Sequence, residues 1–251
     1  MAFGLQRLTL SLLTSICLTV TACSGKQSGY ETVAVALFDV SGSTNEKTVK
    51  EQYLKEFEKV LSFVMVGGVI VADVIDDNPL AHSSYPVNEA ISPYDPLKEN
   101  KLDWERRKRR LRDDVLGSVK VVLEERRSKQ PGTKILEAVQ VAERAFSTYA
   151  GKLKVLVVFS DMIEQSDRYD FSSLSLTPER IQQIITEERS RKRLPSFAGV
   201  EICVTGAGAA RTGGLPSDRL QAIRDFWLEY FTATGGNLPK ARYGASLLKC
   251  P

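Results

Sequence analysis

Five oxygen-bearing side chains are spaced so that they could share one metal ion. Asp39, Ser41 and Ser43 alternate along a segment that follows an apolar run, Asp161 follows another apolar run, and Thr133 comes after a glycine where a helix is predicted. Carboxylates and hydroxyls are hard ligands, which suit Mg²⁺, Mn²⁺ or Ca²⁺ better than Zn²⁺. Two acids and three neutral hydroxyls leave the coordination incomplete. We therefore expect water or an acidic group of a partner to complete it.

The same residue types also cap helices, so the Asp39-x-Ser41-x-Ser43 spacing is not specific by itself. Asp, Ser and Thr are preferred at helix N-caps, and ordinary capping is the alternative interpretation. The position of each residue relative to the predicted strands is more informative. In open parallel sheets, ligands bind outside the carboxyl ends of the strands, which is where Asp39 and Asp161 are expected.

Apolar runs and amphipathic segments predict the elements that position these residues. Continuous apolar runs, typical of strands buried on both faces, span 33–38, 68–75, 153–159 and 200–205. Helical patterns cover 44–64, 99–128, a segment from 133, a segment from 177, and 216–231. Weaker strand signals lie at 80–85 and 243–248. Strands that alternate with helices predict an α/β fold with a mostly parallel sheet covered by helices on both sides.

Length and composition are those of one ordinary α/β domain. The chain has 251 residues, a formal net charge of +3 and four cysteines. These values exclude an overall polycation, an intrinsically disordered chain and a disulfide-dense miniprotein.

Residues 1–22 are predicted to be a secretory signal. Arg7 is their one charge, and an apolar run from Leu8 to Val20 follows it. The run has 13 residues, whereas a transmembrane helix needs about 20. This pattern favours a signal peptide over a membrane-spanning anchor.

Val20-Thr21-Ala22-Cys23 resembles the lipobox of bacterial lipoproteins, which implies that Cys23 is lipidated and becomes the N-terminus. The alternative is an ordinary signal peptide cut after Ala22. The lipoprotein interpretation predicts an exported protein with a lipid anchor in a bacterial membrane, the outer one in a Gram-negative cell. Residues 23–29 would then form a flexible tether, and 30–251 the folded domain.

The two remaining cysteines permit a disulfide in an exported protein. Cys203 lies in a predicted strand and Cys250 is the penultimate residue. A buried free thiol at Cys203 is the alternative. A bridge requires that the C-terminal segment pack beside that strand.

A strongly basic segment lies in the predicted helix 99–128. It contains Arg106, Arg107, Lys108, Arg109, Arg110 and Arg112. We expect a solvated helix whose charge is balanced by neighbouring acids. The alternative is a surface for anionic lipid headgroups or an acidic partner, which suit an exported protein better than nucleic acid does.

Four segments of the chain resemble the von Willebrand factor A family. They are Asp39-Val40-Ser41-Gly42-Ser43 after the first strand, Pro131-Gly132-Thr133 before a helix, Val157-Val158-Phe159-Ser160-Asp161, and the run 200–208 that ends in a glycine turn. The resemblance covers most of residues 30–235. It departs from the family at Met162, where glycine is usual, and in a charged helical insertion at about 86–130.

The resemblance implies a metal-ion-dependent adhesion site. Ser41, Ser43 and Thr133 would bind the ion directly, and Asp39 and Asp161 would do so directly or through water. It also implies a doubly wound sheet with one short antiparallel edge strand. Met162 is expected to reshape the loop that follows Asp161.

The sequence therefore favours a tethered, non-enzymatic binding module. Its metal, Mg²⁺ or else Mn²⁺ or Ca²⁺, would bridge to an exposed carboxylate of a protein or glycan partner. Two alternatives remain open, a Mg²⁺-dependent phosphohydrolase that uses Asp39 and Asp161, and a structural envelope protein with an unused site. Ser41 stands where a phosphohydrolase of this kind would have a second acid, and only Arg211 could clamp a phosphate. Glu164, Asp167 and Asp170 are expected in a solvated loop, with tuning of the metal face as the alternative.

Overall fold

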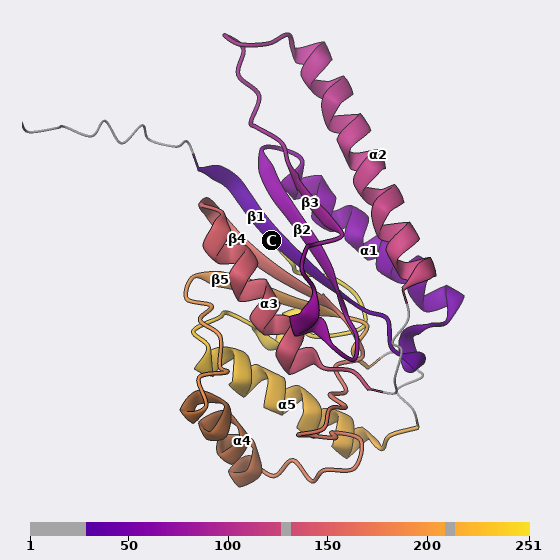
Figure 1. Cartoon of the computed structure of the whole chain (residues 1–251), viewed down its shortest axis with the longest axis vertical. Coiled ribbons are helices and arrows are strands. Elements are labelled where there is room, and N and C mark those ends of the chain that lie inside the picture. The colour runs from indigo at the N-terminus through magenta and orange to yellow at the C-terminus, as the bar shows by residue number, and fades with distance from the viewer. Residues whose placement is uncertain (1–28, 127–131, 209–213) are drawn as a thin grey trace, which may run out of the picture.

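A five-stranded sheet forms the centre of the molecule (Figure 1). The computed structural model describes residues 29–126, 132–208 and 214–251. The strands are β1 (Tyr30–Asp39), β2 (Gly68–Ile75), β3 (Val87–Ala90), β4 (Gly151–Phe159) and β5 (Val200–Thr205). Every residue of β2, and of β1 from Thr32 onward, is buried. Burial on both faces explains why these runs are continuously apolar rather than alternating.

The strand order is β3-β2-β1-β4-β5. The pairs β1–β2, β1–β4 and β4–β5 are parallel, and β3 is antiparallel to β2 at the edge. The fold class predicted from the sequence, a doubly wound α/β fold with one short antiparallel edge strand, is confirmed.

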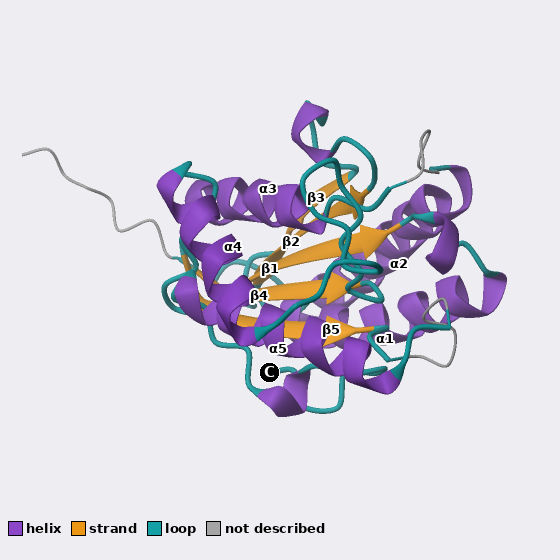
Figure 2. Cartoon of the chain, turned by 90° about the horizontal axis from the view of Figure 1, so that it is seen from below, coloured by secondary structure: helices purple, strands orange, loops and turns teal. Residues whose placement is uncertain are grey.

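Helices cover both faces of the sheet (Figure 2). They are α1 (Lys47–Val64), α2 (Lys101–Glu125), α3 (Ile135–Thr148), α4 (Pro178–Ser190) and α5 (Ser217–Ala233). Alternate residues of β1 supply the two cores, because side chains of a strand point to opposite faces. Val33, Val35 and Leu37 pack with α3, α4 and α5, whereas Ala34 and Phe38 pack with α1 and α2.

The charged helix α2 belongs to the same layer as α1. It buries one apolar stripe against α1 and β3, formed by Trp104, Val115, Val119 and Leu123. Its other faces carry the basic residues. Within the described residues, no helix is both long and apolar enough to span a bilayer.

The register of the sheet brings four strand ends to one edge. Asp39 is opposite Ile75 at the ends of β1 and β2, and Phe159, the last residue of β4, pairs with both Phe38 and Thr205. The loops that follow these strands therefore start side by side.

The predictions of weak strands at 80–85 and 243–248 were wrong. Pro79–Ala81 forms a 3₁₀ turn, and the edge strand starts later, at Val87. Proline fixes φ and lacks an amide hydrogen, so it favours that turn over a strand. In the segment 243–248, Tyr243 makes a single bridge to Val204 and no strand follows.

The C-terminal segment packs along β5 and is bonded to it. Cys203 and Cys250 form a disulfide with their Cα atoms 5.8 Å apart. The Thr205 hydroxyl donates to the Ala245 carbonyl (3.1 Å), and the amide of Leu247 donates to the buried Glu56 carboxylate (2.8 Å). These contacts supply the close approach that the disulfide requires.

Removing this disulfide should destabilise the domain. The Cys203→Ala/Cys250→Ala variant should lose about 2–4 kcal/mol of unfolding free energy, since the bond closes a loop of 47 residues. Urea unfolding of the oxidised chain and the variant measures the difference, and the reduced wild type should behave like the variant. Equal midpoints for all three would contradict this prediction.

Candidate functional site

Asp39 is a buried carboxylate held from three sides. It is 1% exposed. Its Oδ1 accepts the amide hydrogen of Ser41 (2.9 Å) and the hydroxyl of Thr44 (3.3 Å). Its Oδ2 accepts the hydroxyl of Ser160, which comes directly after β4 (2.7 Å). The loop after β1 is therefore fastened to the loop after β4 through this one side chain.

The loop after β1 presents two hydroxyls to the same point. A 3₁₀ turn over Gly42–Thr44 bends the chain, and the Thr44 hydroxyl donates back to the Asp39 carbonyl (2.8 Å). This turn leaves Ser41 Oγ and Ser43 Oγ 3.2 Å apart. Residues that alternate in the sequence are thus brought into direct contact.

Asp161 provides the second carboxylate of the edge. Its Oδ1 accepts the amide hydrogen of Ile163 (3.0 Å), and this bond and the nearby Ser43 hydroxyl both favour the charged form of the carboxylate. The negative charge of Asp161 also acts on Asp39. The structure thus brings four of the five predicted ligands, Asp39, Ser41, Ser43 and Asp161, into one cluster.

The two carboxylates repel each other when both are ionised. Burial, and then the negative charge of Asp161, raise the pKa of Asp39 from 3.8 to about 7 despite the hydrogen bonds it accepts. Burial also raises the pKa of Asp161. Within the described residues, neither acid forms an ion pair with a lysine or arginine. The cluster therefore has an unbalanced negative charge whenever both groups are ionised.

Thr133 is joined through its backbone to the loop that follows Asp161. It is buried, and its amide and carbonyl exchange hydrogen bonds with Gln165, four residues after Asp161 (2.8 and 2.9 Å). Among the described residues, no hydrogen bond joins the Thr133 hydroxyl to the other four predicted ligands. Pro131, Cys23 and Arg211 lie outside the described residues.

Met162 adopts the backbone conformation that favours glycine. Its φ is +65°, and its side chain is fully buried. The Met162 amide hydrogen is accepted by Ser160 Oγ (2.9 Å), and the Trp227 indole donates to the Met162 carbonyl (2.8 Å). These bonds and the buried side chain stabilise a left-handed residue in the loop after Asp161.

A glycine is required at the end of β5. Gly206 has a φ of +94°, and a Cβ atom there would lie 2.9 Å from the Tyr53 hydroxyl and 3.0 Å from the Ser160 carbonyl. Only glycine allows the turn to approach the site so closely.

The expectation that Glu164 is solvated was wrong. Glu164 is fully buried, and its Oε2 accepts the amide hydrogen of Leu136 in the first turn of α3 (3.0 Å). A carboxylate at a helix N-terminus is stabilised by the free amide groups there. Burial still dominates and raises its pKa to about 7. Asp167 and Asp170 are exposed, as expected.

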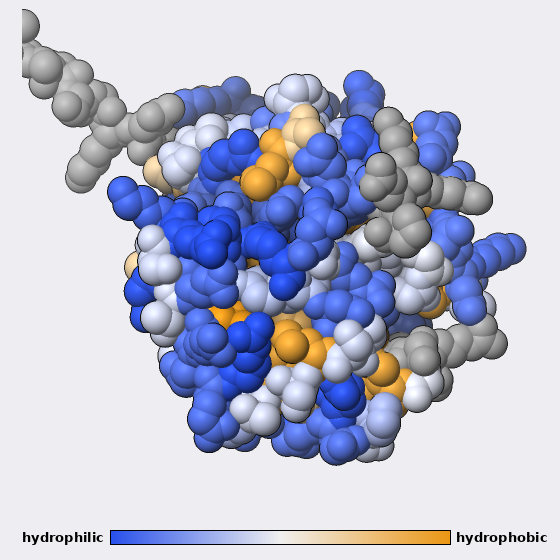
Figure 3. Space-filling view, turned by 60° about the horizontal axis from the view of Figure 1, so that its bottom comes forward, coloured by the Kyte–Doolittle hydropathy of each residue, from blue (hydrophilic) through white to orange (hydrophobic). Residues whose placement is uncertain are grey.

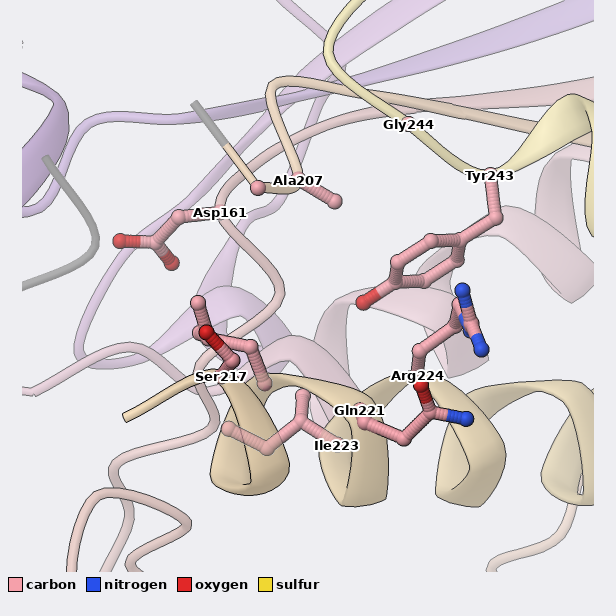
Figure 4. Close-up of a pocket in the computed structure, with 10 residues that line it drawn as sticks. Asp161, Ala207, Ser217, Gln221, Ile223, Arg224, Tyr243 and Gly244 are labelled. Atoms are coloured by element: carbon pink, nitrogen blue, oxygen red, sulfur yellow. The ribbon is translucent and has the colours of Figure 1, made fainter. Parts of the chain in front are cut away.

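A pocket of about 310 Å³ opens beside Asp161 (Figure 4). Ser217, Gln221 and Arg224 of α5 line it, together with Tyr243 of the C-terminal segment. The Tyr243 hydroxyl points into this space (Figure 4). Burial and the charge of Asp161 raise the pKa of Tyr243 well above its usual value, so the hydroxyl stays protonated. The pocket could hydrogen-bond a polar group of a bound partner.

The surface seen from below the sheet in Figure 3 is mostly hydrophilic. Apolar residues show as a few separate small patches in that view. Among the described residues, no three or more His, Cys, Asp or Glu side chains are grouped so that they could hold a metal ion. Any metal bound at this edge would therefore depend on hydroxyl ligands as well as on the two acids.

Sequence reasoning missed the residues that support the ligand set. Ser160 and Thr44 fix the Asp39 carboxylate, and Tyr53 packs beneath the turn at Gly206. The sequence did contain a signal for Ser160, since it lies between the end of the apolar run at Phe159 and Asp161. Thr44 and Tyr53 had none, because their roles depend on the tertiary packing of the loop and α1.

Comparisons with known proteins do not show a family for this chain. No family model matches the sequence, and no curated protein matches it. Among solved structures, one that is similar is described as a von Willebrand factor type A protein from Catenulispora acidiphila, with 13% identity and a TM-score of 0.34. The match covers 82% of this chain and 43% of that one, so the chain spans less than half the length of that protein.

Metal-free protein should lose stability as the pH rises from about 4 to about 7. A raised carboxyl pKa means that the folded state favours the protonated form, so ionisation of Asp39 costs on the order of a few kcal/mol. Asp39→Asn should flatten this dependence. Urea midpoints in EDTA across that pH range measure it, and Glu164 contributes equally to both proteins. Parallel curves for wild type and variant would contradict the prediction.

Proposed function

We propose that this chain is a membrane-tethered binding module at a bacterial cell envelope. A divalent ion, Mg²⁺ first and Mn²⁺ or Ca²⁺ otherwise, would bridge the edge cluster to an acidic group of a protein or glycan partner. The doubly wound fold with this edge is in keeping with a protein-interaction module. The proposal rests most directly on the contact between the Ser41 and Ser43 hydroxyls, close to two carboxylates that have no ion-pair partner among the described residues.

The residues at this edge fit a hard cation. Ser41 and Ser43 offer hydroxyl oxygens 3.2 Å apart, Asp161 offers a second carboxylate near Ser43, and Asp39 is buried. Thr133 would add a third hydroxyl from the neighbouring segment. An all-oxygen set of this kind suits Mg²⁺. The ion would supply a positive charge that attracts the partner's carboxylate and offsets the repulsion between the two acids.

The surroundings of Asp39 favour binding over catalysis. A nucleophilic carboxylate needs an oxygen that can reach the substrate. Both Asp39 oxygens instead accept hydrogen bonds, and the residue is 1% exposed. We therefore propose that its role is to orient Ser41 and Ser160, and not to form a covalent intermediate as in a phosphohydrolase.

The tether is proposed from the sequence of the first 29 residues. The apolar run, the small residues at 20–22 and Cys23 are the features of a lipid-anchored exported protein. The disulfide between Cys203 and Cys250 is in keeping with an oxidising compartment.

Divalent ions should bind to the full chain through this cluster. Calorimetric titration with Mg²⁺ and Mn²⁺, in detergent and with acetate as a stand-in for the partner's carboxylate, should show one site. Ser41→Ala/Ser43→Ala and Asp161→Ala should each weaken binding by about tenfold or more, because each removes a proposed ligand.

Asp167→Ala is the matched control for Asp161→Ala. It removes an acid from the same loop, and its side chain is 95% exposed and, among the described residues, forms an ion pair only with Lys134 (3.6 Å). This variant should bind the ion like the wild type. A folded wild type that binds no ion with or without acetate would contradict the metal-dependent mechanism, and it would move the proposal toward a structural role.

A further inference from the structure

We propose that the segment 92–102 and the first turns of α2 form a membrane-contact surface, which we call the basal surface, that binds anionic lipid headgroups. The inference deepens the proposed function, because it assumes that the chain is tethered at its N-terminus. It commits to one partner, the surface of an anionic bilayer.

The basal surface holds apolar side chains in solvent. Leu97 is 95% exposed, Leu102 is 58% exposed and Tyr94 is 36% exposed. Single exposed apolar residues are common on proteins, but these three lie within nine residues of one another. Such side chains can enter the headgroup region of a bilayer.

The loop that carries Leu97 is firmly attached to α2. The Trp104 indole donates to the Ser92 carbonyl (3.1 Å), and the Tyr94 ring packs on Trp104 at 5.8 Å between centroids. The Arg107 guanidinium binds both carboxylate oxygens of Glu99 (2.7 and 2.9 Å). These contacts attach the loop to α2, and Leu97 nevertheless stays exposed to solvent.

Further contacts fix the start of α2. The Asn100 side chain accepts the amide hydrogen of Leu102 (2.7 Å) and caps the helix. Lys108 lies over the Trp104 ring, 4.5 Å from its centroid. Leu97 and Leu102 are thus presented from a pre-ordered platform, which lowers the ordering cost of binding.

The charge of this segment matches an anionic surface. Residues 95–112 contain eight basic and four acidic side chains, a net charge of +4. Several of the basic groups are paired, such as Arg107 with Glu99 and Lys108 with Glu105 (2.7 Å). Arg109 and Arg110 are exposed, and within the described residues neither has an ion-pair partner. Basic residues beside a bilayer attract its anionic lipids.

The chain enters the fold beside this surface. Gly29 and Tyr30 line the same groove as the loop residues Pro93 and Lys98. Figure 1 shows β1 beginning and α2 beginning at the same end of the molecule. Six residues separate Gly29 from Cys23 and can span at most about 20 Å. A lipid on Cys23 would hold the basal surface close to the bilayer.

The candidate metal edge lies at the other end of β1. β1 runs for ten residues from Tyr30 to Asp39, or about 30 Å. Contact through the basal surface would therefore orient the metal edge away from the membrane, where a partner can reach it.

Hydrogen exchange on the full chain tests this inference. The chain is attached to vesicles of phosphatidylcholine alone or with phosphatidylglycerol, and flotation checks attachment to each. Backbone amides of 92–102 should exchange about tenfold more slowly on the phosphatidylglycerol vesicles than on the neutral ones. High salt should weaken this protection.

Two matched variants of α2 separate the basal surface from the rest of the helix. Lys101→Gln/Leu102→Ser removes a cation and an exposed apolar residue there, and it should reduce the protection about fivefold or more. Lys120→Gln/Val121→Ser makes the same change near the other end of α2, where Lys120 is also exposed and Val121 is 48% exposed. This control should keep the wild-type protection.

The possible outcomes distinguish failure of the basal surface from failure of the lipid anchor. An attached chain with equal exchange on both kinds of vesicle would overturn the basal surface and leave the tether and the metal edge untouched. Protection on anionic vesicles without flotation on neutral ones would support the surface and contradict the lipid anchor. Equal protection by soluble polyphosphate would assign the surface to a soluble polyanion and overturn the inference.

Discussion

The parallel pairing of β1 with β4 is the constraint on which the candidate site depends. Phe38 is opposite Phe159, and their stacked rings lie 4.4 Å apart beneath the edge. This pairing sets Asp39 beside Ser160, whose hydroxyl it accepts. A slip of one strand by one residue would turn its aromatic side chain to the other face, away from its partner, and would shift the two loops relative to each other. The core and the site are therefore specified by the same contacts.

At the edge of the sheet where the candidate site lies, Asp39 and Asp161 are in surroundings that disfavour their charged forms. Asp39 is 1% exposed, so it loses most of its hydration. Hydrogen bonds from Ser41 and Ser160 offset only part of this cost. A bound cation would offset more of it. If a cation binds there as proposed, the arrangement would be more stable with the ion than without it.

Much of the sheet could be predicted because its strands are continuous apolar runs, and β5 was predicted with its observed bounds. Asp39 and Asp161 followed from the ends of these runs. Glu164 could not be placed, since its burial depends on α3 docking onto a loop distant in the sequence. The edge strand β3 was misplaced because four residues with mixed polarity carry little signal. Local patterns therefore located the candidate ligand residues, but not the groups that hold them in place.

The C-terminal segment also affects how the domain behaves among its own copies. β5 is the last strand of the sheet, and an uncovered strand edge can pair with another chain and start aggregation. Here the backbone of Asn237 bonds to Ile202 and Val200 (both 2.9 Å), and the amide of Gly244 bonds to Val204 (3.3 Å). The disulfide keeps this cover in place. In a reducing compartment the cover would be held more weakly, and self-association through β5 would become easier.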